Sequence, residues 1–279
     1  MSKVKIKLVS IGHLPLEFQT HKVTKWKSST FEIAGNIDNF ALRCDSDGLH
    51  WEFSDERVKE QLPKNFDADF MIAIVNVPIK HNWYSRRLGN NQVVFTFHEI
   101  KDILEHCNIP LENVVYRLLY AYTLLYRRSG NKIPDFGEAP GFTHDETRGC
   151  LFDMNGIKTD LVASCHQPQI CDECQERLKQ ERVSKEDIEN TQKDIKKIQK
   201  DLYFRLVGHI KRHPILALTL SSLFALFLGV VGSIIGSAAY SHFTDIPGIK
   251  PGITNSSNES KTAPVVNKPQ QSTPAKPSS

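Results

Sequence analysis

Four of the six cysteines lie close together in the sequence, and the last two form a Cys-x-x-Cys motif at Cys171 and Cys174. Two thiolates at this spacing present two ligands to one tetrahedral ion, and zinc is the natural ion for mixed thiolate and imidazole ligands. Two more ligands are needed, and residues of the right types precede the motif. We predict a structural zinc with the ligands Cys150, Cys171, Cys174 and His144, or with Cys165 in place of His144.

Other interpretations of these cysteines remain open. They can be reduced, partly buried thiols without a metal, or the motif can be a redox pair. Its position counts against redox chemistry, because it follows a loop and precedes a charged segment instead of lying between a strand and a helix. His166 is a further candidate for the fourth zinc ligand.

From His144 onward the pattern resembles the archaemetzincins, a branch of the zinc metallopeptidases. In that family the third catalytic histidine is followed directly by a cysteine, then by a second cysteine, and further on by a closing Cys-x-x-Cys. The four cysteines hold a structural zinc. By this resemblance His144 matches the catalytic histidine, Cys150 the second cysteine, and Cys171 with Cys174 the closing motif. The resemblance covers approximately residues 65–180 and implies a metallopeptidase-like fold.

The chain departs from the family where the catalytic residues belong. Asp145 stands in place of the first structural cysteine, and Met154 lies further from Cys150 than the family's methionine does. The family's HExxHxxGxxH motif is absent, and Pro134 and Glu138 occupy the positions of its first two histidines. The resemblance therefore implies a scaffold that kept its zinc knuckle and lost catalysis, with no catalytic residues assigned.

The sequence offers one alternative catalytic set. His98 and Glu99 are followed by Asp102, so that an HExxD sequence stands where a peptidase would carry HExxH. Residues four apart share a helix face, and His98, Glu99, Asp102 and His144 would then form a divergent metal site. The simpler interpretation is that these are exposed polar residues of an ordinary amphipathic helix.

The elements that must position these residues belong to an α+β (mixed α/β) domain over residues 1–178, with the Cys/His cluster at 144–174. Apolar runs predict strands at 3–9, 30–34, 70–77 and 92–97. Helices are predicted at 54–61, 98–107 and 111–128. The last of these is too apolar for a surface helix, so we expect it to run through the core.

Residues 214–240 form 27 uncharged, mostly apolar residues, which predicts a single transmembrane helix. Six basic residues precede this segment within a short distance: Lys196, Lys197, Lys200, Arg205, Lys211 and Arg212. After it the first basic residue is Lys250. The positive-inside rule therefore predicts a single-pass membrane protein with a cytoplasmic N-terminus and an extracytoplasmic C-terminus.

Two further segments flank this helix. Residues 179–213 are predicted to form a helical stalk, which is either a solvated connecting helix or a coiled coil along Ile188, Ile195 and Leu202, with Ile198 between. Residues 241–279 are rich in Pro, Ser, Thr, Asn and Gln and predict a disordered extracytoplasmic tail.

Small residues line one side of the predicted membrane helix. Gly232 and Gly236 form a GxxxG pair, and Gly229 and Ser233 form a second pair on a neighbouring face. Such residues let two helix backbones approach closely. Together with the stalk, they predict a homodimer.

The net charge of +3 gives no reason to expect nucleic acid as a partner. The sequence therefore predicts a membrane-anchored cytoplasmic zinc-binding module, non-catalytic, for sensing or for binding an unidentified protein partner at the bilayer. The alternatives are a divergent membrane-bound zinc metallopeptidase and an oligomerising membrane effector of a bacterial defence type.

Overall fold

The computed structural model describes residues 2–138, 148–153 and 157–244. The chain divides into two compact units, one ending at His213 and the other beginning at Pro214. His144 and the tail beyond 244 lie outside the described residues, so the predictions made for them stay predictions.

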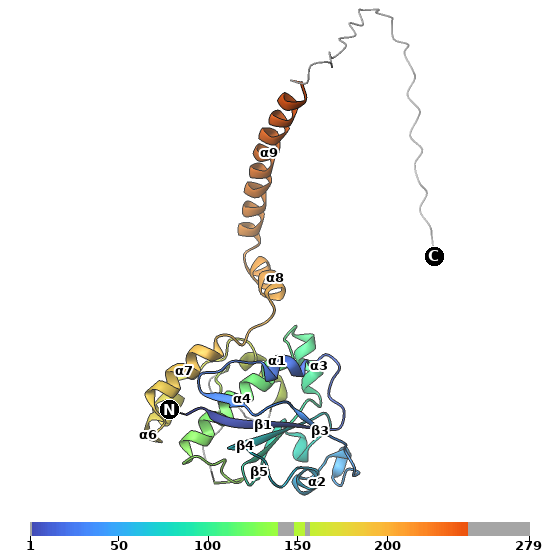
Figure 1. The fold of residues 1–279 in the computed structure, drawn as a ribbon, viewed down its shortest axis with the longest axis vertical. Helices are drawn as coiled ribbons and strands as arrows, with labels where there is room; N and C mark the ends of the chain where they lie inside the picture. Colours follow the sequence, from blue (N-terminus) through green and yellow to red (C-terminus); the bar gives the residue numbers. More distant parts are fainter. Residues whose placement is uncertain (1, 139–147, 154–156, 245–279) are drawn as a thin grey trace, which may run out of the picture. The chain divides into compact units, whose positions relative to one another are not determined.

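A six-stranded sheet forms the centre of the first unit (Figure 1). Its strands are β1 (Val4–Ile11), β2 (Phe31–Ile33), β3 (Asp38–Phe40), β4 (Phe70–Val75), β5 (Ser85–Gly89) and β6 (Gln92–Thr96). The main order is β2-β1-β4-β6-β5, with β3 also paired to β1. All pairs are parallel except β5 with β6, and all six residues of β4 are buried. The sheet is therefore covered on both faces, as parallel sheets are.

Helices and short helical turns cover the two faces of the sheet. The first unit contains α1 (Thr20–Thr24), η1 (Leu49–Trp51), α2 (Asp55–Glu60), η2 (Lys80–Asn82), α3 (Ile100–His106), α4 (Glu112–Arg128), η3 (Lys158–Asp160), α5 (Leu161–Ser164), α6 (Asp172–Gln180), α7 (Lys185–Ile195) and α8 (Leu202–Arg212). Val58 of α2 belongs to a smaller core on one face, and α1, α3 and α4 contribute to the larger core on the other. The predicted mixed α/β domain, with its four strands and three helices, is confirmed.

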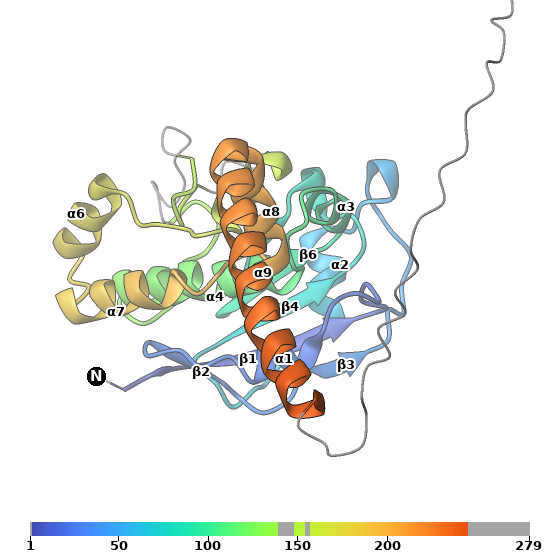
Figure 2. The same cartoon turned by 90° about the horizontal axis from the view of Figure 1, so that it is seen from above.

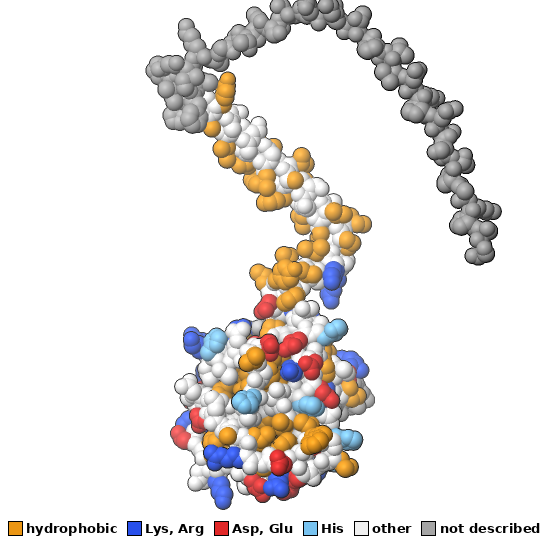
Figure 3. Space-filling model, turned by 90° about the vertical axis from the view of Figure 1, so that its right-hand side faces the viewer, with side chains coloured by type: hydrophobic (Ala, Val, Ile, Leu, Met, Phe, Trp, Pro, Cys, Tyr) orange, Lys and Arg blue, Asp and Glu red, His pale blue; other side chains and the backbone are white. Residues whose placement is uncertain are grey.

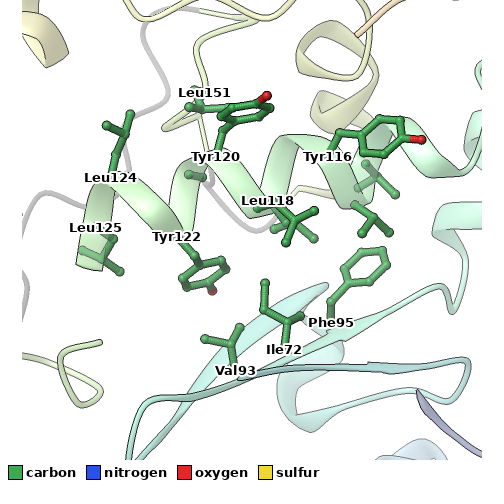
Figure 4. Packing of buried hydrophobic residues seen from close by; sticks show 14 of the residues in the cluster. Ile72, Val93, Phe95, Tyr116, Leu118, Tyr120, Tyr122, Leu124, Leu125 and Leu151 are labelled. Carbon is green, nitrogen blue, oxygen red and sulfur yellow. The ribbon is translucent and has the colours of Figure 1, made fainter. Parts of the chain in front are cut away.

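Helix α4 runs through the larger core, as predicted from its apolar sequence. Every residue from Glu112 to Tyr126 is buried. Figure 4 shows Leu118 and Tyr122 on the side that faces the sheet, towards Ile72, while Leu151 lies on the opposite side of the helix. The segment that carries the cysteines therefore covers the side of α4 that the sheet leaves open.

Helix α7 completes this covering layer and lies beside α4 (Figure 2). Ile188, Ile195 and Ile198, three of the four residues of the predicted heptad seam, are buried in the larger core. Leu202 is 74% exposed and starts a separate helix. The structure therefore differs from the predicted stalk: residues 185–198 belong to the domain, because their apolar stripe packs inward and is not available to a second chain.

The second unit contains α9 (Pro214–Thr244), a single long helix. Over Pro214–Ser241 it is long and apolar enough to cross a membrane, and none of its most apolar stretch is buried against the rest of the protein. Apolar side chains follow one another along its length (Figure 3). Among the described residues it is the one helix with this property.

Asp194 fixes the end of α7 to the start of the sheet. One carboxylate oxygen accepts hydrogen bonds from the backbone N–H and the hydroxyl of Ser29, both at 2.7 Å. The other accepts a hydrogen bond from Nζ of Lys197 at 2.6 Å. Burial acts to raise the pKa of Asp194, but the bonds from Lys197 and Ser29 outweigh it, so that the pKa lies below its ordinary value of 3.8.

We predict that Asp194→Ala lowers the free energy of unfolding of residues 1–213 by about 1–3 kcal/mol, because the buried hydroxyl of Ser28, 3.3 Å from the carboxylate, and the backbone N–H of Ser29 lose their acceptor. Urea unfolding followed by tryptophan fluorescence at neutral pH measures the loss. Since the folded-state pKa is lowered, the contribution of the carboxylate is present above the unfolded pKa. It is lost as the pH falls through the folded-state value, below 3.8.

Glu189 provides the matched control, since it is an exposed acid on the same helix whose contact, with Lys185 at 3.5 Å, is also exposed. Glu189→Ala is expected to change the stability by less than about 0.5 kcal/mol. Equal losses for the two variants would contradict the assigned role of Asp194.

Candidate metal centre

Three cysteine sulfurs converge beside the N-terminus of α6. The Sγ atoms of Cys150, Cys171 and Cys174 all lie within 4.8 Å of one another, and those of Cys150 and Cys174 are 3.9 Å apart. A tetrahedral zinc with bonds of about 2.3 Å places its sulfur ligands about 3.8 Å apart. The three side chains therefore fit three corners of a zinc site.

The start of α6 sets the positions of two of these ligands. Cys171 is the extended N-cap residue, and Cys174 lies in the first helical turn, three residues later. This spacing brings both sulfurs to one side of the helix. The N-terminal end of a helix also carries a partial positive charge, which favours thiolate over thiol.

A short backbone pairing brings Cys150 to the same place. The N–H of Leu151 donates to the carbonyl of Gln169 at 2.7 Å, and the N–H of Gln169 donates to the carbonyl of Gly149 at 3.0 Å. Gly149 has a φ of +82°, and a Cβ there would lie 3.3 Å from the carbonyl oxygen of Ala163. Glycine thus permits the turn that aligns Cys150 with the segment leading into α6.

Without a metal, the thiols of Cys171 and Cys174 hold their protons at neutral pH. The pKa of Cys174 is raised above its ordinary value by its hydrogen bond with Cys150 and by burial. Burial also raises the pKa of Cys171. A bound divalent ion reverses this preference, because it stabilises the thiolates that coordinate it. Zinc binding here would release protons and would weaken as the pH falls.

The other proposed ligands have different positions. Cys165 is fully buried and outside the three-sulfur group, and burial raises its pKa to about 12, with Arg117 acting in the opposite direction. His166 accepts a hydrogen bond from the backbone N–H of Lys200 at 3.2 Å through Nδ1. His144 lies outside the described residues. The structure thus brings together three of the predicted ligands and does not add Cys165.

The alternative catalytic set does not assemble among the described residues. Glu99 has a φ of +64°, and α3 begins only at Ile100, so His98 precedes the helix and does not share a face with Asp102. Glu99 instead accepts hydrogen bonds from Lys158 at 2.9 Å and from Asn82 at 3.0 Å. The bond from Lys158 is the main reason that the pKa of Glu99 lies below its ordinary value.

Arg117 supports the cysteine-bearing segment and was missed in the sequence. It is fully buried in the middle of α4, donates to the hydroxyl of Ser164 through Nε, and donates to the carbonyl of Asp153 at 2.5 Å through Nη2. Its two partners lie between Cys150 and Cys171 in the sequence. The available signal was a single charged residue within the stretch from Val114 to Tyr126, because a buried cation needs polar partners nearby.

Comparisons with known proteins give one similar structure to report. No family model matches the sequence, and no curated protein matches it. Among solved structures, the crystal structure of archaemetzincin from Methanopyrus kandleri at 1.5 Å resolution matches with a TM-score of 0.40 and 14% sequence identity. The match covers 64% of this chain and 95% of that one. Similarity at this level does not establish membership of a family.

We predict that replacing any one of Cys150, Cys171 and Cys174 by serine removes bound zinc from the purified full chain, because two remaining thiolates hold the ion weakly. Mass spectrometric metal analysis measures the zinc content. Cobalt substitution provides a second measurement, because its sulfur-to-metal charge-transfer bands weaken with each lost thiolate.

Cys44→Ser is the matched control, since Cys44 is partly buried and lies on the other face of the sheet. It should keep its zinc. Loss of zinc from Cys44→Ser, or full zinc retention in all three cluster variants, would contradict the assignment. The variants His144→Ala and Cys165→Ser then identify the fourth ligand.

Proposed function

We propose that this chain is a single-pass membrane-anchored zinc-binding module that does not catalyse peptide hydrolysis and that presents its N-terminal domain to a protein partner in the cytoplasm. The observation that carries the proposal is the convergence of three cysteine sulfurs at the start of α6. The distances between these sulfurs fit three corners of a structural zinc site, and the proposal assigns the fourth corner to His144.

Zinc at this site would join two parts of the layer that covers α4. Cys150 lies on the segment that packs against the helix, and Cys171 and Cys174 begin the helix that follows. A structural zinc stabilises the arrangement of the segments that supply its ligands. The proposed role of the ion is therefore to hold the surface formed by α6 and the neighbouring loop.

The proposal assigns no catalytic role to His98, Glu99 and Asp102. A hydrolytic zinc site needs three protein ligands, an open position for water and a general base. Glu99 is engaged by Lys158 and Asn82, and His98 precedes α3. These contacts support a structural role for the residues of the HExxD sequence.

The anchor in this proposal is α9, oriented by the basic residues that precede it. Its 28-residue apolar stretch, Pro214–Ser241, exceeds the approximately 20 residues that cross a bilayer. The excess of lysine and arginine on the N-terminal side supports a cytoplasmic domain and an extracytoplasmic C-terminus.

We predict that Leu223→Arg combined with Leu226→Arg releases the protein from membranes, because each arginine near the centre of a span costs about 2.5–3.5 kcal/mol. Extraction at alkaline pH measures the release.

The orientation can be tested separately. A membrane-impermeant maleimide should label Ser272→Cys in intact cells, and it should label the native cysteines only after lysis.

The exposed leucines Leu16 and Leu49 give the matched control for the anchor, and arginine at these positions should leave the protein in the membrane fraction.

Zinc analysis tests the non-catalytic part of the proposal. His98→Ala should keep the same zinc content as the native chain. A second, exchangeable zinc that disappears in His98→Ala would favour the metallopeptidase alternative.

The proposal also includes pairing of two chains through α9. Gly229, Gly232 and Gly236 each have open space where a Cβ would stand, so the described residues leave this face uncovered. Pairing through the predicted coiled-coil stalk is no longer part of it, since the isoleucines of that seam are buried in the domain.

We predict that Gly232→Leu with Gly236→Leu disrupts the dimer, because two leucines keep the helix backbones apart. Energy transfer between labelled chains in vesicles, measured against dilution in lipid, reports the association. Ala238→Leu places the same side chain on the other side of the helix and should leave association unchanged. Equal transfer in all three proteins would contradict pairing through this face.

A further inference from the structure

Helix α8 presents an uncovered apolar face. Leu202, Leu206 and Ile210 follow one another at intervals of four residues and are 74%, 57% and 47% exposed. Tyr203 lies beside them and is 69% exposed. Residues at this spacing share one side of a helix. Nothing in the described part of the chain covers that side.

The opposite side of α8 is turned towards the domain. Phe204 and Val207 are half-buried, and Phe204 lines a groove of the domain together with Glu105 and Leu111. Helix α8 therefore has apolar residues on two faces. The domain covers the face of Phe204 and leaves the face of Leu206 exposed.

Basic residues accompany the uncovered face. Arg205 and Arg212 are seven residues apart and lie on one side of the helix, next to Leu202, whereas Lys211 lies on the side of Phe204. The helix contains no acidic residue. Within the part of the chain that the structure describes, no carboxylate forms an ion pair with Arg205, Lys211 or Arg212. Apolar and basic side chains are mixed at this end of the domain (Figure 3).

The position of α8 in the chain indicates what covers this face. Only His213 separates Arg212 from Pro214, where the apolar helix α9 begins. One residue spans at most about 3.5 Å. If α9 crosses a membrane, the end of α8 must therefore lie at the bilayer surface. An apolar stripe beside arginines and lysines is the pattern of a helix that lies in an anionic membrane interface.

We propose that α8 lies in the plane of the cytoplasmic membrane interface, with Leu202, Leu206 and Ile210 among the acyl chains and with Arg205 and Arg212 against anionic headgroups. This inference rests on the proposed membrane anchoring by α9. It adds that the domain is docked on the bilayer through α8 and is not connected to it by a flexible stalk. Phe204, on the other side of the same helix, contacts the domain.

Hydrogen exchange of the full chain in lipid nanodiscs tests the proposal. The amides of α8 should exchange more slowly in discs that contain phosphatidylglycerol than in discs of phosphatidylcholine alone. Leu206→Gln with Ile210→Gln should reduce this protection by roughly tenfold, because two partly buried aliphatic side chains are lost from the interface. Glutamine keeps the helix propensity close to that of leucine, so a change in α8 itself is a small effect.

Two control variants separate the contributions. Leu16→Gln with Leu49→Gln changes two exposed leucines outside α8 and should leave the protection as it is. Arg205→Gln with Arg212→Gln should remove the difference between the two lipid compositions, because it removes the attraction to anionic headgroups. The difference should also shrink at high salt, which screens that attraction.

The exchange of α9 in the same samples distinguishes the two proposals. If α9 is protected and α8 exchanges equally in both lipids and in all variants, the docking inference is wrong and the anchor stands. If α9 is unprotected and the protein leaves the discs, the anchoring proposal fails, and the docking inference fails with it. Protection of α8 that appears only with two chains per disc would show that a second copy covers the face, and would overturn the lipid assignment.

Discussion

The N-terminal unit is organised by the burial of α4 on both sides. The sheet covers one side and the segment from Arg148 onward covers the other, so that every residue from Glu112 to Tyr126 is buried. A fully buried large apolar side chain contributes about 1.5–3 kcal/mol, and α4 buries many of them. The domain requires the second covering layer for its stability, because without it an apolar face of α4 would be exposed to water.

Arg117 imposes a more specific constraint on that layer. A guanidinium without exposed surface is costly to bury unless its N–H groups find acceptors. Ser164 and the carbonyl of Asp153 are two such acceptors, and both belong to the stretch between Cys150 and Cys171. The arginine thus places the segment that carries the first cysteine at a defined point on α4. The three sulfurs converge because protein contacts have already positioned two separate segments, so that an ion would add to a prepared site.

The sequence predicted correctly those elements whose structure is decided by their own residues, and it failed where contacts with distant residues decide the structure. The apolar runs of β4 and α4 predicted their elements, because a continuous apolar run of that length must be buried. Thiolate chemistry likewise grouped Cys150 with the Cys171 motif. The isoleucines of α7 were misjudged, because an apolar stripe on a helix is compatible with packing on its own domain and with packing on a second chain.

The HExxD sequence illustrates the opposite difficulty. Its spacing indicates a shared helix face only if all five residues are helical, and the positive φ of Glu99 breaks that condition. A left-handed residue other than glycine is uncommon, and nothing in the neighbouring residue types predicted it here. What fixes Glu99 is its pairing with Lys158, which lies far away in the sequence. Contacts between residues that are distant in the sequence determine which side chains come together at the candidate site. The spacing of neighbouring residues does not reveal such contacts.

The burial of α7 also changes what the proposed membrane anchoring would mean for the domain. Ile198 is fully buried, and α8 begins at Leu202, so that only three residues separate the domain core from that helix. Three extended residues reach about 10 Å, and the eleven residues of α8 add about 16 Å along its axis. A chain with a stalk over 179–213 would let its domain move widely above a bilayer. If α9 spans a membrane as proposed, this short connection would keep the domain close to the bilayer, and a surface stabilised by zinc would meet partners that are themselves at the membrane.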